Sequence, residues 1–68
     1  MTVLVFGTGL IGTSVALALS RHGVRVLLED RDPDAARTAA SLGAGTVLAE
    51  QGPDGPVDLA VLGVEIVL

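Results

Sequence analysis

Four short runs of apolar residues divide the chain, and each is typical of a strand. The first, TVLVF at residues 2–6, has no polar alternation. A strand of this kind belongs inside a sheet that helices cover on both faces. The pattern predicts the other strands at residues 24–28, 46–49 and 57–62, which read VRVLL, TVLA and VDLAVL.

The segments between the first three strands predict two helices. Residues 10–21 are helix formers that end before Gly23, a residue suited to the position after a helix. Their helical spacing predicts an apolar stripe toward the sheet, formed by Ile11, Val15, Ala18 and Leu19. The second helix, residues 33–42, begins with a proline after the N-cap Asp32 and stops at Gly43.

Strands and helices alternate up to residues 51–56, where QGPDGP predicts a loop. Such alternation indicates βαβ units and a parallel sheet with flanking helices, which is an α/β fold. The third connection is short, so the pairing of the third and fourth strands stays open. With 68 residues the chain forms at most one small domain, and we expect marginal stability with a broad thermal transition.

The stretch GTGLIG at residues 7–12 follows the first strand and opens the first helix. This context gives the GxGxxG pattern its weight, because it is the dinucleotide-binding fingerprint of a Rossmann-type fold. Gly7 permits a tight turn, Gly9 lets a pyrophosphate approach the backbone, and Gly12 lets the helix pack on the strand. The sequence therefore predicts that residues 1–68 form the N-terminal portion of a dinucleotide-binding domain.

The remaining residues of this loop are candidates for direct contact with the phosphates. We expect the N–H groups of Leu10 and Ile11 to bind them at the positive end of the helix, with Thr8 lining the loop. Thr13 and Ser14 follow in the first helical turn. Their hydroxyls could bond a phosphate, although small residues there more often serve packing.

Asp30 lies eighteen positions after Gly12 (30 − 12), at the end of the second strand. A carboxylate there holds the adenosine ribose hydroxyls and repels a 2′-phosphate, which favours NAD over NADP. Arg31 keeps NADP open, because an arginine at this place can accommodate a 2′-phosphate or lie on the adenine. Glu29 is the rival ribose ligand, and it is expected to point to the other side of the strand.

Composition and charge exclude several other kinds of function. The net charge of −4 and four scattered arginines argue against nucleic acid as a partner. The apolar runs are shorter than a membrane span and no signal peptide is evident, so the expected location is the cytoplasm, away from membranes. The single histidine, His22, lies at the far end of the first helix, where it complements the dipole. We expect no catalytic residue and no metal site.

Three stretches together resemble the amino-terminal part of the prephenate/arogenate dehydrogenase family. These are VLVFGTGLIGTSVALALSRHG, VLLEDRDPDAARTAASLGAG and VDLAVLGV, which cover nearly the whole chain. The resemblance implies oxidation of prephenate or arogenate with loss of CO2, by hydride transfer to NAD(P)+, in tyrosine biosynthesis. It also implies a homodimer, with a catalytic histidine and a helical substrate domain located further along a longer chain.

One departure from that family lies after the fourth strand, where the family usually has a proline and this chain reads GVEIVL at residues 63–68. The chain also stops on an apolar residue without a capping helix, so we expect a fragment of a longer enzyme that is inactive alone, or a truncated or degenerate gene product. Two alternatives stay open: a nucleotide-sensing regulatory module, and another Rossmann-fold dehydrogenase acting on a hydroxy acid or an imine.

Overall fold

The computed structural model describes residues 1–51 and 57–62. Its elements follow the expected order, with one additional short helix after the third strand. They are β1 (Thr2–Phe6), α1 (Leu10–Arg21), β2 (Arg25–Glu29), α2 (Pro33–Ser41), β3 (Thr46–Val47), α3 (Leu48–Gln51) and β4 (Leu59–Leu62). The α/β class and the parallel sheet with flanking helices are thereby confirmed.

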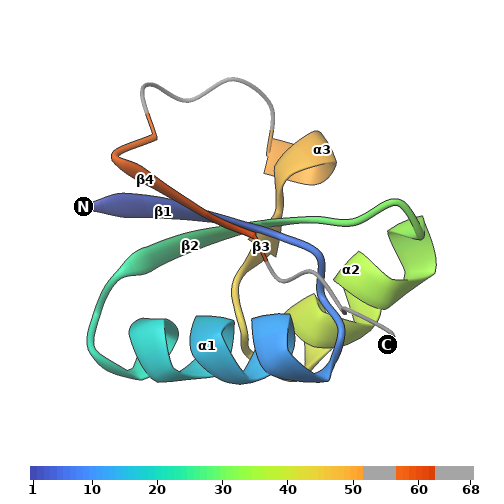
Figure 1. The fold of residues 1–68 in the computed structure, drawn as a ribbon, viewed down its shortest axis with the longest axis horizontal. Coiled ribbons are helices and arrows are strands. Elements are labelled where there is room, and N and C mark those ends of the chain that lie inside the picture. Colours follow the sequence, from blue (N-terminus) through green and yellow to red (C-terminus); the bar gives the residue numbers. More distant parts are fainter. Residues whose placement is uncertain (52–56, 63–68) are drawn as a thin grey trace.

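The strands form one parallel sheet in the order β3-β2-β1-β4 (Figure 1). This settles the pairing that the sequence left open, because β3 joins the outer edge of β2 and β4 joins the other side of β1. Doubly wound dinucleotide-binding sheets begin with the same order, 3-2-1-4. In such sheets the order reverses between strands 1 and 4, and ligands bind outside the carboxyl ends of the strands at that point. The topology therefore directs attention to the carboxyl end of β1.

The core lies between the sheet and the layer formed by α1 and α2, which cover one face (Figure 1). It is built from small and branched aliphatic side chains, namely Val3, Val5, Ala16, Val26, Leu28, Ala39 and Ala44. The apolar stripe expected on the first helix was wrong in part, because Ile11 and Ala18 are exposed. Gly12 and Ala16 face the sheet instead, since residues this small let the helix approach the strands closely.

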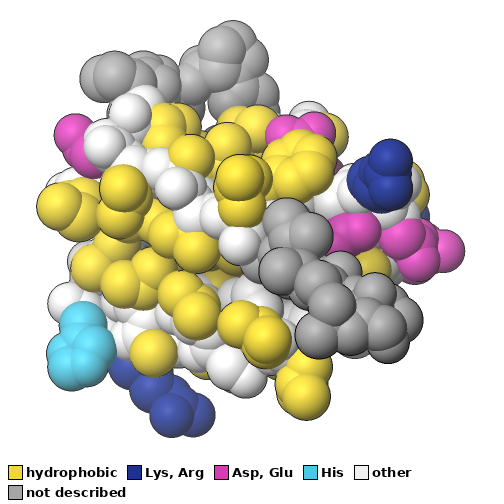
Figure 2. Space-filling model, viewed as in Figure 1, with side chains coloured by type: hydrophobic (Ala, Val, Ile, Leu, Met, Phe, Trp, Pro, Cys, Tyr) yellow, Lys and Arg dark blue, Asp and Glu magenta, His cyan; other side chains and the backbone are white. Residues whose placement is uncertain are grey.

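The opposite face of the sheet is only partly covered in the described part of the chain, contrary to the expectation of helices on both faces. The four-residue α3 lies on this side (Figure 1). Phe6 remains 39% exposed, and Leu62 at the edge strand β4 is 70% exposed. In Figure 2, which has the same view as Figure 1, apolar side chains gather across the middle of the surface.

Most element boundaries agree with the sequence to within a residue or two, and one prediction was wrong. The third strand was expected at residues 46–49, but the strand ends at Val47 and α3 follows directly. The sequence LAEQ of α3 consists of strong helix formers, which explains the change. Most of the expected loop at 51–56 lies outside the described residues.

Candidate functional site

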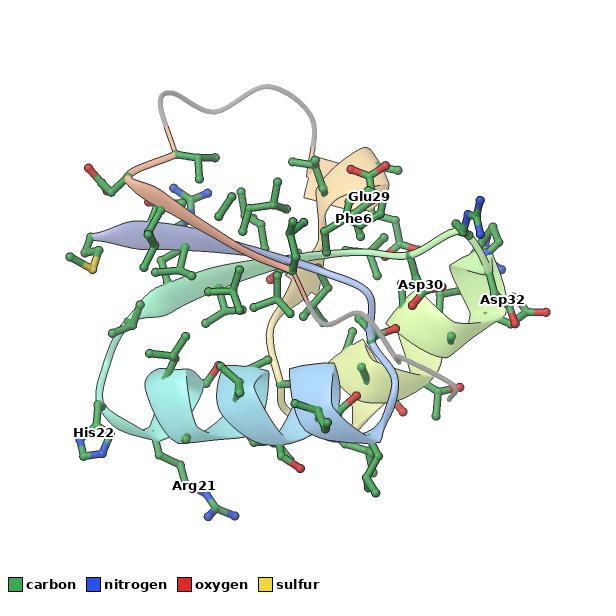
Figure 3. All side chains as sticks on the ribbon, viewed as in Figure 1. Phe6, Arg21, His22, Glu29, Asp30 and Asp32 are labelled. Carbon is green, nitrogen blue, oxygen red and sulfur yellow. The ribbon has the colours of Figure 1, made fainter. Side chains whose placement is uncertain are left out.

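The site lies where the carboxyl ends of β1 and β2 meet. These strands pair in parallel with Phe6 opposite Glu29, so the residues that follow them emerge at the same edge of the sheet. The Gly7 N–H donates to the Glu29 carbonyl oxygen at 2.8 Å and extends the pairing by one step. The glycine-rich turn and Asp30 are therefore neighbours in space although far apart in sequence (Figure 3).

The structure gives separate reasons for two of the three glycines. Gly7 has φ of +95°, a backbone conformation that residues with a Cβ rarely adopt. A Cβ added to Gly12 would overlap the carbonyl oxygen of Gly7. Gly9 is the N-cap of α1 in an extended conformation, with φ of −68°. Conformation alone thus does not demand glycine there, and its proposed role is to leave space for a ligand.

Within residues 1–51 and 57–62, the N-terminus of α1 has none of the usual side-chain partners. Its N-cap makes no side-chain hydrogen bond, and no acidic residue occupies the first turn. The N–H of Thr13 donates to the Gly9 carbonyl at 2.9 Å. The N–H groups of Leu10, Ile11 and Gly12 precede that bond, in the part of a helix where N–H groups have no intrahelical acceptor. They form a positive end that suits an anion.

Asp30 is bonded directly to the glycine-rich turn. Its Oδ2 atom accepts the backbone N–H of Thr8 at 2.5 Å and the Thr8 hydroxyl at 2.9 Å. Its Oδ1 atom accepts the N–H of Asp32 at 2.9 Å. The carboxylate is thus fixed beside the glycine-rich turn, while Asp30 itself stays partly exposed.

The neighbours of Asp30 on the chain lie differently. Glu29 pairs with Phe6 in the sheet, and both side chains project toward the α3 side, away from the glycine-rich turn (Figure 3). This agrees with the expected orientation of Glu29 and leaves Asp30 as the carboxylate that faces the glycine-rich turn. Arg31 is exposed, next to the carboxylate.

With this geometry established, comparison with known proteins identifies the family. The model of the FAD dependent oxidoreductase family matches residues 2–67. The chain belongs to the FAD dependent oxidoreductase family. The matched residues comprise nearly the whole chain.

A second comparison supports the resemblance to prephenate dehydrogenases that the sequence indicated. The chain is 51% identical over 63 residues to a protein named probable prephenate dehydrogenase NovF, from Streptomyces niveus. The match covers 93% of this chain and 17% of that relative, so the chain spans about a sixth of the relative's length. The similarity to prephenate dehydrogenases is thereby confirmed. No solved structure is significantly similar to the chain.

The remaining candidate side chains bond to backbone atoms or lie away from the glycine-rich turn. The hydroxyl of Thr13 donates to the Thr8 carbonyl, and that of Ser14 donates to the Leu10 carbonyl, each at 2.8 Å. This favours the structural role for both. His22 caps the opposite end of α1, far along the helix from the glycine-rich turn (Figure 3). Among the described helices none is long and apolar enough to cross a membrane.

The sequence analysis missed the bond between Thr8 and Asp30. It placed Thr8 in the loop as a cofactor contact, but the Thr8 side chain turns inward and is only 7% exposed. A signal was available, because the sequence places a hydroxyl residue between the first two glycines and an acid after the second strand. Parallel pairing of the two strands brings these positions to the same edge.

The hydrogen bonds to Asp30 lower the pKa of its carboxyl group. The N–H of Asp32 is the largest cause and the N–H of Thr8 the next, while burial acts in the opposite direction. Since the folded pKa lies below the ordinary value of 3.8, the bonds of the ionised carboxylate stabilise the fold fully above that pH. This contribution is lost as the pH falls through the folded pKa. We expect the NMR shift of the Thr8 amide proton to titrate with a midpoint below 3.8. A midpoint at or above that value would contradict the arrangement.

Proposed function

We propose that residues 1–68 form the NAD-binding part of a prephenate dehydrogenase-like oxidoreductase. The observation that carries this proposal is the fixed Asp30 carboxylate beside the uncapped N-terminus of α1. One feature suits a ribose and the other a pyrophosphate, and their order along the chain is that of a dinucleotide fingerprint. The prephenate substrate is taken from the name of the relative and from the sequence resemblance.

Each residue of the site has a distinct task in this proposal. The N–H groups of Leu10 and Ile11 bind the pyrophosphate, which approaches over Gly9 because that residue has no side chain. Asp30 accepts a hydrogen bond from a hydroxyl of the adenosine ribose. A nicotinamide cofactor held in this way would supply the acceptor for the hydride that the substrate loses. We expect it to extend toward the carboxyl end of β4 near Gly63, which lies outside the described residues.

The chemistry itself is assigned to other parts of a full-length enzyme. We propose that the catalytic histidine, the substrate pocket and the contacts of a cytoplasmic homodimer belong to segments beyond this dinucleotide-binding part. The full-length enzyme would convert prephenate with loss of CO2 in tyrosine biosynthesis. The 68 residues alone would bind the cofactor without turnover, as His22 lies away from the site.

The family description favours a second candidate cofactor, FAD. NAD and FAD share an ADP half, and glycine-rich βαβ units bind both. The described site faces that shared half, so its geometry is compatible with either cofactor. NAD is preferred because the similar protein is named a dehydrogenase of prephenate.

Calorimetric titration of the full chain with NAD, NADP and FAD tests the proposal. We expect NAD to bind about tenfold more tightly than NADP, a difference of about 1.4 kcal/mol, because Asp30 repels a 2′-phosphate. FAD binding more tightly than NAD would reassign the chain to flavin chemistry. NADP binding as tightly as NAD would show that Arg31 offsets the charge of Asp30.

A further inference from the structure

Thr8 is the buried polar centre of the site, with all three of its polar groups hydrogen-bonded. Its N–H and its hydroxyl donate to Oδ2 of Asp30. Its carbonyl oxygen accepts the hydroxyl of Thr13 at 2.8 Å. The residue therefore joins the end of β2, the glycine-rich turn and the first turn of α1.

We propose that Thr8 is a positioning residue that couples the ribose end of the site to its phosphate end. It uses the Asp30 carboxylate to hold the turn between Gly7 and Gly9 in the shape that admits a pyrophosphate. This inference rests on the proposed function, and it adds a task for Asp30 beyond contact with the ribose. It does not depend on whether the complete cofactor is NAD or FAD.

The number of acceptor positions on Asp30 supports the coupling. A carboxylate offers about four lone-pair positions. Thr8 takes two of them on Oδ2, and the N–H of Asp32 takes one on Oδ1. A ribose hydroxyl can occupy the remaining position on Oδ1 without displacing Thr8. Ribose binding and loop positioning can therefore use the same carboxylate at once.

The positioning role predicts an effect even on a ligand that offers no ribose hydroxyl to Asp30. The probes are ADP, which is common to NAD and FAD, and 2′,3′-dideoxy-ADP, whose ribose has no hydroxyl to offer Asp30. Thr8→Val removes the hydroxyl and keeps the shape and the backbone N–H. Thr8→Ser restores a hydroxyl. The matched control is Thr38→Val, which removes an exposed hydroxyl in α2 that donates to the Asp34 carbonyl.

Calorimetry on the full chain gives the decisive comparison. We expect Thr8→Val to weaken the binding of both ADP and dideoxy-ADP about tenfold, because it removes a hydrogen bond to a charged group that holds the loop in position. The affinities of Thr8→Ser and Thr38→Val for both ligands should stay within about twofold of the unmodified chain. The first variant keeps a hydroxyl at position 8, and the second changes an exposed residue in α2.

The outcomes separate this inference from the proposed function. If Thr8→Val weakens the binding of ADP but not that of dideoxy-ADP, the positioning role is overturned, because Thr8 would then act only on the ribose. Unchanged binding of both ligands would also overturn it. If Thr8→Val fails to fold, Asp30→Ala supplies the test, since it must weaken dideoxy-ADP as well as ADP. An unmodified chain that binds no ADP would instead refute the proposed function, and the coupling with it.

Discussion

Replacing Gly12 with alanine is expected to lower both the folding stability of the chain and its affinity for a nucleotide strongly. The added Cβ would overlap the carbonyl oxygen of Gly7 and lie 3.1 Å from the carbonyl carbon of the same residue. Both are backbone atoms of the turn that leaves β1, so no side chain can rotate away. Helix α1 would have to move off the sheet, which would open the core around Val5.

The expected loss of folding stability is large in relation to the total stability of the chain. Overpacking of this kind costs about 1–3 kcal/mol or more. A domain of this size has a total stability of roughly 3–10 kcal/mol, at about 0.05–0.15 kcal/mol per residue. The same displacement moves the N–H groups of Leu10 and Ile11 away from the phosphate position. Stability and binding are therefore expected to fall together.

Urea unfolding followed by circular dichroism, together with ADP titration, measures both effects. Gly43→Ala is the matched control, because a Cβ there meets nothing within 4 Å and only the positive φ of +90° is unfavourable. We expect this control to cost about 1 kcal/mol and to leave binding unchanged. A Gly12→Ala chain as stable as the control would show that α1 and β1 can separate more easily than the structure indicates.

The sequence predicted those elements whose signals are local. Residues 10–21 lie between a glycine-rich turn and Gly23, and the helix has those bounds. The N-cap of α2 was also predicted from the sequence. Asp32 accepts a hydrogen bond from the N–H of Asp34, as an N-cap residue does. Local signals also placed the fingerprint in its context of strand, turn and helix.

What the sequence did not predict depends on contacts between distant segments. The position of β4 beside β1 is decided by sheet pairing, which the short third connection left open. The prediction of which face of α1 packs on the sheet was wrong in part. Apolar spacing favoured Ile11, whereas close packing on the sheet requires the smaller Gly12 and Ala16. The bond from Thr8 to Asp30 spans 22 positions and exists because β1 and β2 end together. Steric and pairing constraints of this kind are not visible in hydrophobic periodicity.

The second large effect is expected at the carboxylate itself. Asp30→Ala should weaken NAD binding about a hundredfold, since hydrogen bonds to a charged group contribute about 1.5–3 kcal/mol each and several depend on this one side chain. The change removes the acceptor for the ribose. It also leaves the Thr8 N–H and hydroxyl without their acceptor next to the phosphate loop. Both losses act on the bound state, one directly and one through the shape of the turn.

Glu29→Ala provides a matched control on the adjacent residue. It removes one carboxylate and one negative charge, as Asp30→Ala does, but from a side chain that projects to the other face of the sheet (Figure 3). A general effect of charge would weaken or strengthen NAD binding similarly in both variants. The proposed site predicts that only Asp30→Ala loses affinity, with Glu29→Ala within about twofold. Equal affinities of the two variants in calorimetric titration would remove Asp30 from the site, and with it the argument that this edge of the sheet binds the ribose.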